Sequence, residues 1–198
     1  MANILPNVKH IVVVMFENRS FDTMLGWLYP DGDRPNVVLP AGSSPRFDGV
    51  RTNMSNPSKS GKPVYVTTEV TSFSLPSPAP HDRFANVKEQ VSAAPSWTDE
   101  TVGPMQGFVV NYQSTSSTDE RQVMQCHSPA QLPVLSTLAR SYAVCDAWFS
   151  SVPSDTLPNR AFMLSGTSNG HVDGGGFNPL RWTMPTIFNV LTSMHANW

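Results

Sequence analysis

The sequence predicts an α/β fold, a largely parallel sheet flanked by helices, on the strength of three patterns. Residues 11–16 form a continuous apolar run rich in valine, as is typical of a strand buried on both faces. Four apolar residues between positions 21 and 28 then follow at helical spacing, which predicts a helix with Ser20 as its N-cap. A second apolar run at 143–149 leads through a polar turn into another helical pattern. Such alternation is characteristic of α/β layers.

The rest of the chain divides into a loop-rich region and further helices. Residues 29–80 are rich in Pro, Gly, Ser and Asn, and a stretch of this length predicts a loop-rich insertion in a compact domain. We expect residues 1–198 to form part of a single domain. The other helices expected from apolar spacing cover residues 82–91, 130–142, 161–165 and 185–195.

Composition narrows the classes of partner. Lys and Arg total 13 against 15 Asp and Glu, a net charge of −2, which gives no electrostatic basis for nucleic acid or an anionic membrane as the main partner. The apolar run at 11–16 is far too short to cross a bilayer, so we expect no transmembrane segment. The amino terminus also lacks the pattern of a secretory signal. We therefore expect a chain made without a signal or one that has lost it, and the compartment stays open.

The two cysteines leave two alternatives open. Cys126 and Cys145 could form a disulfide in an exported protein, or they could both be buried thiols. We favour buried thiols, because Cys145 lies within the apolar run expected to form a core strand.

Two strand-to-helix turns carry the candidate chemistry. Ligands of open parallel sheets bind outside the carboxyl ends of the strands, where both Glu17-Asn18 and Thr156 are expected. A carboxylate directly after a buried strand is costly unless it is paired or bound to a metal. A hard divalent cation would use the oxygens of Glu17 and Asn18. The alternative is that both residues merely cap the next helix.

Thr156 is expected near a helix N-terminus, since Pro158 suits the first turn of a helix. Free N–H groups at that end favour a bound phosphate. A threonine hydroxyl is a poor nucleophile unless a metal helps to deprotonate it. Asn159 and Arg160 could contact phosphate oxygens, and Arg160 could equally form a structural ion pair. The alternative for Thr156 or its neighbour Asp155 is an ordinary N-cap.

Two long motifs resemble a known family. Residues 8–22, and then residues 151–160 with 165–168, resemble the bacterial phosphoesterase family that contains phosphatidylcholine-type phospholipases C and acid phosphatases. That family belongs to the alkaline-phosphatase-like superfamily of α/β metalloenzymes, and its members are often exported. The resemblance covers about residues 8–198 and implies that this chain is the amino-terminal part of one phosphoesterase catalytic domain, incomplete at its carboxy terminus.

The resemblance also implies roles for the candidate residues. Glu17 and Asn18 would bind a divalent metal ion of unknown identity together with Thr156, and Thr156 would be the nucleophile that forms a phosphothreonine intermediate. His81 matches a family histidine near the phosphate. Because family members supply further metal ligands from a carboxy-terminal half, we expect that half to be a missing partner and the 198 residues alone to be inactive.

Three functions remain open at this point. The first is a phospholipase C that acts on phospholipid head groups, which threonine as nucleophile and the insertion at 29–80 favour. The second is an acid phosphatase that acts on phosphomonoesters. The third is a non-catalytic binding module derived from the enzyme.

Overall fold

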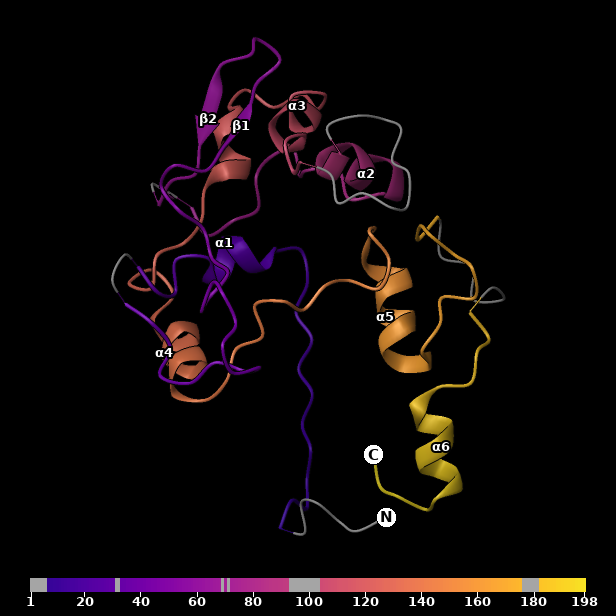
Figure 1. Ribbon diagram of the computed structural model, residues 1–198. Helices are drawn as coiled ribbons and strands as arrows, with labels where there is room; N and C mark the ends of the chain where they lie inside the picture. Colours follow the sequence, from indigo (N-terminus) through magenta and orange to yellow (C-terminus); the bar gives the residue numbers. More distant parts are fainter. Residues whose placement is uncertain (1–6, 31–32, 69, 71, 93–103, 176–181) are drawn as a thin grey trace.

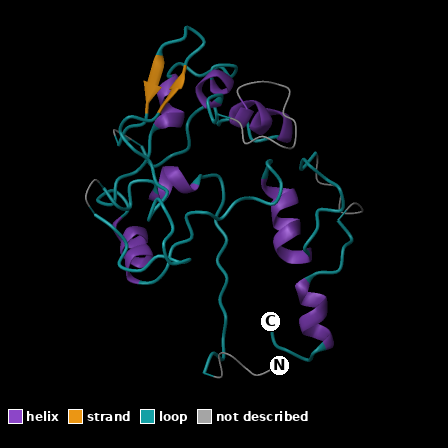
Figure 2. Cartoon of the chain, viewed as in Figure 1, coloured by secondary structure: helices purple, strands orange, loops and turns teal. Residues whose placement is uncertain are grey.

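The architecture is that of a computed structural model in which short helices are joined by long loops (Figures 1 and 2). The structure describes residues 7–30, 33–68, 70, 72–92, 104–175 and 182–198. Its elements, in chain order, are α1 (Phe21–Leu25), β1 (Ser55–Pro57), β2 (Pro63–Tyr65), α2 (Phe84–Ser92), α3 (Phe108–Tyr112), the 3-10 helix η1 (Glu120–Met124), α4 (Pro133–Ser141), α5 (Thr156–Ser165) and α6 (Ile187–Ser193).

The helices predicted from apolar spacing are confirmed as α1, α2, α4, α5 and α6. Ser20 caps α1 as expected, because its hydroxyl accepts a hydrogen bond of 3.1 Å from the backbone N–H of Thr23. Gly166 ends α5 in the left-handed conformation, with φ at 69°, which a residue without a Cβ adopts at little cost. The short elements α3 and η1 were not predicted.

The α/β class is confirmed, but the described residues contain no large parallel sheet. The one sheet among them pairs β1 with β2 in antiparallel register, Asn56 opposite Val64, and it lies inside the region predicted as a loop-rich insertion. An isolated bridge between Thr67 and Gln125 is parallel.

The two runs predicted as buried strands are not strands in the structure. Residues 11–16 carry no strand assignment, and the exposure of their side chains ranges from 37% at Met15 to 88% at Phe16. Residues 143–149 form turns and loop, with Trp148 82% exposed. A strand requires a neighbour that accepts and donates its backbone hydrogen bonds, and the described part of the chain places none beside either run.

The apolar core lies where α2, α3, η1 and β1 meet. Val109 and Tyr112 of α3 are at most 1% exposed, and Met124 of η1 is 7% exposed. Asn111, also buried, joins two helices, because its carboxamide donates to the Glu89 carboxylate at 2.6 Å and accepts from Gln90 at 2.9 Å. The core therefore includes a satisfied polar link between α2 and α3.

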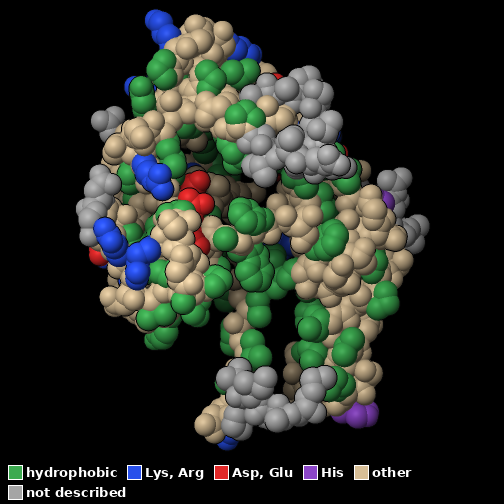
Figure 3. Space-filling view, in the orientation of Figure 1, with side chains coloured by type: hydrophobic (Ala, Val, Ile, Leu, Met, Phe, Trp, Pro, Cys, Tyr) green, Lys and Arg blue, Asp and Glu red, His purple; other side chains and the backbone are tan. Residues whose placement is uncertain are grey.

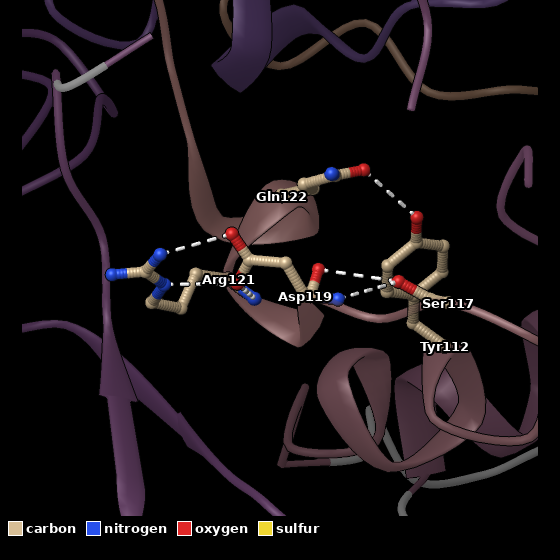
Figure 4. Close-up of polar contacts among 5 residues, drawn as sticks. All are labelled: Tyr112, Ser117, Asp119, Arg121 and Gln122. Carbon is tan, nitrogen blue, oxygen red and sulfur yellow. Dashed lines mark hydrogen bonds and ion pairs between the residues drawn. The ribbon is translucent and has the colours of Figure 1, made fainter. Parts of the chain in front are cut away.

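Polar contacts fix the chain between α3 and η1 (Figure 4). The Tyr112 hydroxyl lies 3.1 Å from the side-chain oxygen of Gln122 and 3.0 Å from the backbone oxygen of Pro78. Asp119 caps η1 by accepting from the backbone of Arg121, and its carboxylate also pairs with the Arg121 guanidinium at 2.8 Å. The side-chain hydrogen bond from Arg121 lowers the pKa of Asp119.

The free thiols are confirmed in part. Neither cysteine is in a disulfide, and Cys126 is buried, which raises the pKa of its thiol to about 12. Cys145, however, is exposed, so the expectation of two buried thiols is wrong for that residue. Its position follows from the missing strand pairing at 143–149.

Replacing Tyr112 with Phe should lower the free energy of unfolding by about 1–2 kcal/mol, because the buried hydroxyl and its contacts with the Gln122 side chain and the Pro78 backbone oxygen are lost. Urea denaturation measures the change. Tyr65→Phe is the matched control, since Tyr65 is 54% exposed and the same change there should cost less than about 0.5 kcal/mol. Equal effects at the two positions would contradict the role assigned to Tyr112.

Candidate active site

Thr156 is the first residue of α5 and lies half-buried at the end of the helix. No described residue hydrogen-bonds its hydroxyl. The preceding residue, Asp155, occupies the N-cap position, but its side chain makes no capping hydrogen bond. Asp155 is therefore the N-cap residue by its backbone position, but its side chain does not cap the helix. The ten-residue helix α5 therefore begins with uncapped backbone N–H groups beside a free hydroxyl. Such a helix N-terminus is a favourable place for an anion.

The turn that precedes Thr156 is held by the side chain of Asn159. Its amide nitrogen donates to the backbone oxygens of Val152, Ser154 and Asp155 at 2.9, 3.2 and 3.0 Å. Its oxygen accepts from the backbone N–H of Val152 at 3.0 Å. Both ends of the carboxamide are thus engaged with the chain's own backbone, and Asn159 fixes the turn in this structure.

A second clamp ties the turn to the loop after α5. Both carboxylate oxygens of Asp155 accept from the backbone N–H of Gly174, at 2.9 and 2.8 Å. Asp173 accepts from the Ser154 hydroxyl at 2.9 Å and from the backbone N–H of Phe84, the first residue of α2, at 2.7 Å. A Cβ on Gly174 would lie 3.0 Å from an Asp155 carboxylate oxygen, so a larger residue there would displace that side chain.

Glu17 and α5 meet although 143 residues separate Glu17 from its partner. The Glu17 carboxylate accepts from Arg160 at 2.8 Å and 3.1 Å. Arg160 follows Thr156 by four residues, so the two side chains lie on the same side of α5. The structure therefore brings the first predicted turn to the helix that begins with Thr156. Both partners are more than 40% exposed, so the pair adds little stability by itself.

Asn18 and His81 make no hydrogen bond or ion pair with Glu17, Thr156 or Arg160 among the described residues. Asn18 is exposed and has a φ of 69°, a left-handed conformation that asparagine tolerates better than most residues and that often accompanies function. His81 is exposed, with its Nδ1 atom 3.4 Å from the Asn86 side chain. It lies three residues before Phe84, the first residue of α2. The Phe84 N–H donates to Asp173, which also accepts from Ser154 in the turn before Thr156.

The described residues supply the right type of metal ligand but too few of them. Glu17, Asn18 and Thr156 offer oxygen atoms, which suit a hard divalent cation. Nowhere in the described part of the chain do three His, Cys, Asp or Glu side chains gather into a group able to hold a metal ion. Arg160 also occupies the Glu17 carboxylate. Any cation bound here needs further ligands.

His127 lies in a loop but is buried, whereas a single loop histidine in a sequence is more often solvated. It is 3% exposed, stacks on Phe73 with 5.2 Å between ring centroids, and its Nδ1 atom has no hydrogen-bond partner among the described residues. Burial, with a smaller effect of Arg19, lowers its pKa. No sequence pattern marks it, because its burial depends on contacts distant in the chain.

A wide cavity of about 860 Å³ lies away from the predicted site residues. It is open to solvent and is lined by residues 33–39, 46–47 and 139–148, with Tyr29 at one side. Its arginines are largely engaged within the chain: Arg140 pairs with Asp33 at 2.9 Å. None of the residues predicted for the phosphate or metal contributes to it.

A family model now places the chain. The model described as the phosphoesterase family matches residues 8–198. The chain belongs to this family. Non-specific phospholipase C3 of Arabidopsis thaliana is 38% identical over 167 residues, 82% of this chain and 30% of that protein. Non-hemolytic phospholipase C of Pseudomonas aeruginosa is 27% identical over 176 residues, which cover 87% of this chain and 22% of that protein.

The same pattern holds for another relative of this chain. Phospholipase C B of Mycobacterium tuberculosis is 26% identical over 213 residues, 98% of this chain and 35% of that protein. The chain thus spans about a third or less of the length of these relatives. Within the described residues, no helix has the length and apolar character needed to cross a membrane.

Replacing Asn159 with Ala should lower the free energy of unfolding by about 2 kcal/mol, because four hydrogen bonds to the turn are lost. Chemical denaturation measures the effect. Asn36→Ala serves as control, since the exposed Asn36 side chain has no hydrogen bond to a described residue. A stability equal to that of the unchanged protein would show that Asn159 does not hold the turn.

Folding stability should fall as the pH drops below the ordinary histidine pKa of 6.5. In that range His127 binds a proton in the unfolded chain, whereas in the folded chain its lowered pKa keeps it neutral. His127→Phe keeps an aromatic ring against Phe73 and removes that proton uptake. Thermal unfolding between about pH 7 and pH 5 should therefore show a shallower decline in the variant. The other histidines are common to both proteins. Parallel declines would assign the pH dependence to them.

Proposed function

We propose that this phosphoesterase contributes the nucleophile of a metal-dependent phospholipase C, with Thr156 forming a phosphothreonine intermediate. One observation carries the proposal: an unpartnered hydroxyl lies at the N-terminus of α5, on the side of the helix where Arg160 holds Glu17. A free hydroxyl, backbone N–H groups and a guanidinium together match the demands of phosphoryl transfer.

The proposed reaction has two displacements at phosphorus. The Thr156 oxygen attacks the phosphorus atom, the hydroxyl proton leaves, and the bond to the diacylglycerol oxygen breaks as that oxygen gains a proton. Water then attacks the same phosphorus and loses a proton, the bond to the Thr156 oxygen breaks as that oxygen regains a proton, and the phosphorylated head group is released. The N–H groups of the first turn of α5 stabilise negative charge on the phosphoryl oxygens in both steps.

A divalent metal ion of unknown identity completes the proposed site. Glu17, Asn18 and Thr156 would hold it through oxygen atoms, and when bound it favours the deprotonated hydroxyl. Arg160 neutralises Glu17 in the structure, and its release from Glu17 would free the guanidinium to contact a phosphoryl oxygen. His81, near the start of α2, is proposed to contact the phosphate.

Asn159 is proposed to position the turn before Thr156, in addition to any contact with phosphate. Its carboxamide is committed to the backbone of the turn, and so it holds the residues that lead into Thr156. Asp155 and Gly174 restrain the same turn from the other side. A preorganised nucleophile needs such restraint, because small displacements reduce the rate of attack sharply.

Phospholipids are the favoured substrates over phosphomonoesters. Relatives from a plant and from two bacteria carry the name phospholipase C. Their length supports a catalytic domain that extends beyond what this chain matches, so we propose that the 198 residues alone are inactive and act together with a carboxy-terminal part. The fold beyond the described elements is proposed to be the alkaline-phosphatase-like parallel sheet.

Thr156→Ala should abolish hydrolysis of phosphatidylcholine in a version of the protein extended by the carboxy-terminal part that the relatives possess. We expect a loss of at least 1,000-fold in kcat, because no other group replaces the attacking oxygen. Thr156→Ser should retain measurable turnover. Thr52→Ala is the matched control, since it removes an exposed threonine hydroxyl outside the site.

Three outcomes would redirect the assignment. Unchanged turnover in Thr156→Ala would refute the nucleophile. Faster hydrolysis of p-nitrophenyl phosphate than of phosphatidylcholine would favour an acid phosphatase. A protein that binds no metal in this extended form, with no turnover of either substrate, would indicate a non-catalytic binding module.

A further inference from the structure

The first helical N–H of α2 is capped by a residue far along the chain. The backbone oxygen of Arg83 accepts from Val87 at 2.9 Å, so Arg83 occupies the N-cap position of α2. An arginine side chain has no hydrogen-bond acceptor and cannot cap the helix. The Phe84 N–H instead donates to Oδ1 of Asp173 at 2.7 Å, across 89 positions of sequence. A carboxylate is favourable at a helix N-terminus, so Asp173 takes the place of a local cap.

The same oxygen atom of Asp173 also holds the turn before Thr156. It accepts from the Ser154 hydroxyl at 2.9 Å, and the next residue, Gly174, donates its N–H to the Asp155 carboxylate. One carboxylate oxygen therefore joins donors from two segments, the start of α2 and the turn that opens α5. The charge of the acceptor strengthens both hydrogen bonds.

Direct packing between α2 and α5 is slight by comparison. Among the described elements, α2 packs mainly against α3, and α5 packs against α6, as Figure 1 shows. Figure 3 shows hydrophobic side chains along the part of the molecule that holds α5 and α6. Apolar packing thus groups each helix with its neighbour in sequence, and the Asp173 carboxylate links the two groups.

His81 is tied to α2, so its position depends on that helix. The side-chain nitrogen of Gln90 donates to the His81 backbone oxygen at 2.7 Å, and also to the carboxamide oxygen of buried Asn111 at 2.9 Å. The Nδ1 atom of His81 lies 3.4 Å from the side chain of Asn86, which is also on α2. His81 is therefore held by two residues of the helix whose first N–H is capped by Asp173.

We propose that Asp173 is a positioning residue that sets the distance between His81 and Thr156. The inference rests on the proposed function, because it takes Thr156 as the nucleophile and His81 as a phosphate contact. Both groups must meet the same phosphoryl group, and a small displacement of either one lowers the rate. Asp173 acts through α2 and through the turn before α5, and does not touch the substrate itself.

An ordinary structural cap is the competing explanation, and a set of variants separates it from a positioning role. Asp173→Asn keeps a side-chain oxygen that can accept from both donors, whereas Asp173→Ala removes the acceptor. Asp119→Ala is the matched control. Asp119 is also a carboxylate that accepts from a backbone N–H at the start of a helix, η1, in the part of the chain around α3.

The first test uses the 198-residue chain and needs no activity. Hydrogen–deuterium exchange at the Phe84 amide, followed by NMR, should be about tenfold faster or more in Asp173→Ala, because the N–H loses its acceptor. Exchange in Asp173→Asn should stay within about threefold of the unchanged protein. Asp119→Ala should leave the Phe84 amide unaffected. Unchanged exchange at Phe84 in Asp173→Ala would overturn the bridge.

The second test measures hydrolysis of phosphatidylcholine by the version extended by the carboxy-terminal part that the relatives possess. Asp173→Ala should lower kcat by about tenfold or more and change KM by less than about twofold, because the displaced groups act in the transition state. Asp173→Asn should keep about half of the kcat or more. Asp119→Ala should keep the full kcat, even though it removes a helix cap.

A double-mutant cycle with His81 gives the sharpest readout. In a His81→Ala background, the further change Asp173→Ala should lower kcat by about twofold or less, because no imidazole is left to position. The turn before Thr156 keeps its contacts with Asn159 and Asp155 in that background.

Three results would overturn the positioning role. The first is an equal loss of kcat in Asp119→Ala. The second is a loss from Asp173→Ala that is as large in the His81→Ala background as in the unchanged protein. The third is an unchanged kcat in His81→Ala itself, which would leave the Thr156 nucleophile standing. Failure of the nucleophile shows separately, as unchanged turnover in Thr156→Ala.

Discussion

The geometry of the candidate site depends on one side chain, the carboxamide of Asn159. It occupies the carbonyl groups of the turn from Val152 to Asp155 and accepts a backbone N–H in return. The Asp155 carboxylate makes no capping hydrogen bond to the helix and instead accepts from the backbone N–H of Gly174. The N-terminus of the helix is left open beside Thr156. An ordinary capping arrangement would have closed the position where a phosphate would bind.

This arrangement extends outward through carboxylates. Asp173, next to Gly174, reaches the first N–H of α2 and thereby links the region of His81 to the Thr156 turn. On the other side, Arg160 brings Glu17 to α5. Each contact contributes little energy, since exposed ion pairs and single hydrogen bonds add about 1 kcal/mol or less. Their importance lies in converging on one helix from segments distant in sequence.

The sequence predicted what depends on neighbours along the chain. Helical spacing identified α1 and α5, and the Ser20 cap was confirmed, because these signals lie within one or two turns. The proximity of Glu17 to α5 was expected from strand ends that should meet at one sheet edge. The pairing itself arises without that sheet, through Arg160, which had been given two alternative roles.

The features that sequence reasoning missed require knowledge of distant contacts. Asn159 was expected to contact phosphate, yet its partners are backbone groups of a turn whose shape no spacing rule supplies. His127 and Tyr112 carry no local pattern, and their burial depends on segments far along the chain. The strand at 11–16 was predicted from its composition, but a strand forms only where a neighbour pairs with it.

The position of the core explains why the site can be polar and still well defined. Val109 and Tyr112, two of the most buried apolar residues, belong to α3, whereas near the start of α5 the buried apolar residues of the described chain are Val152, Pro158 and Ala161. Because apolar packing is non-directional, these few apolar residues do not fix the conformation of the turn. Hydrogen bonds are directional, and the six made by the Asn159 and Asp155 side chains fix the turn's conformation. The conformation of the turn that leads into Thr156 is therefore held by side chains of the turn and of α5 itself.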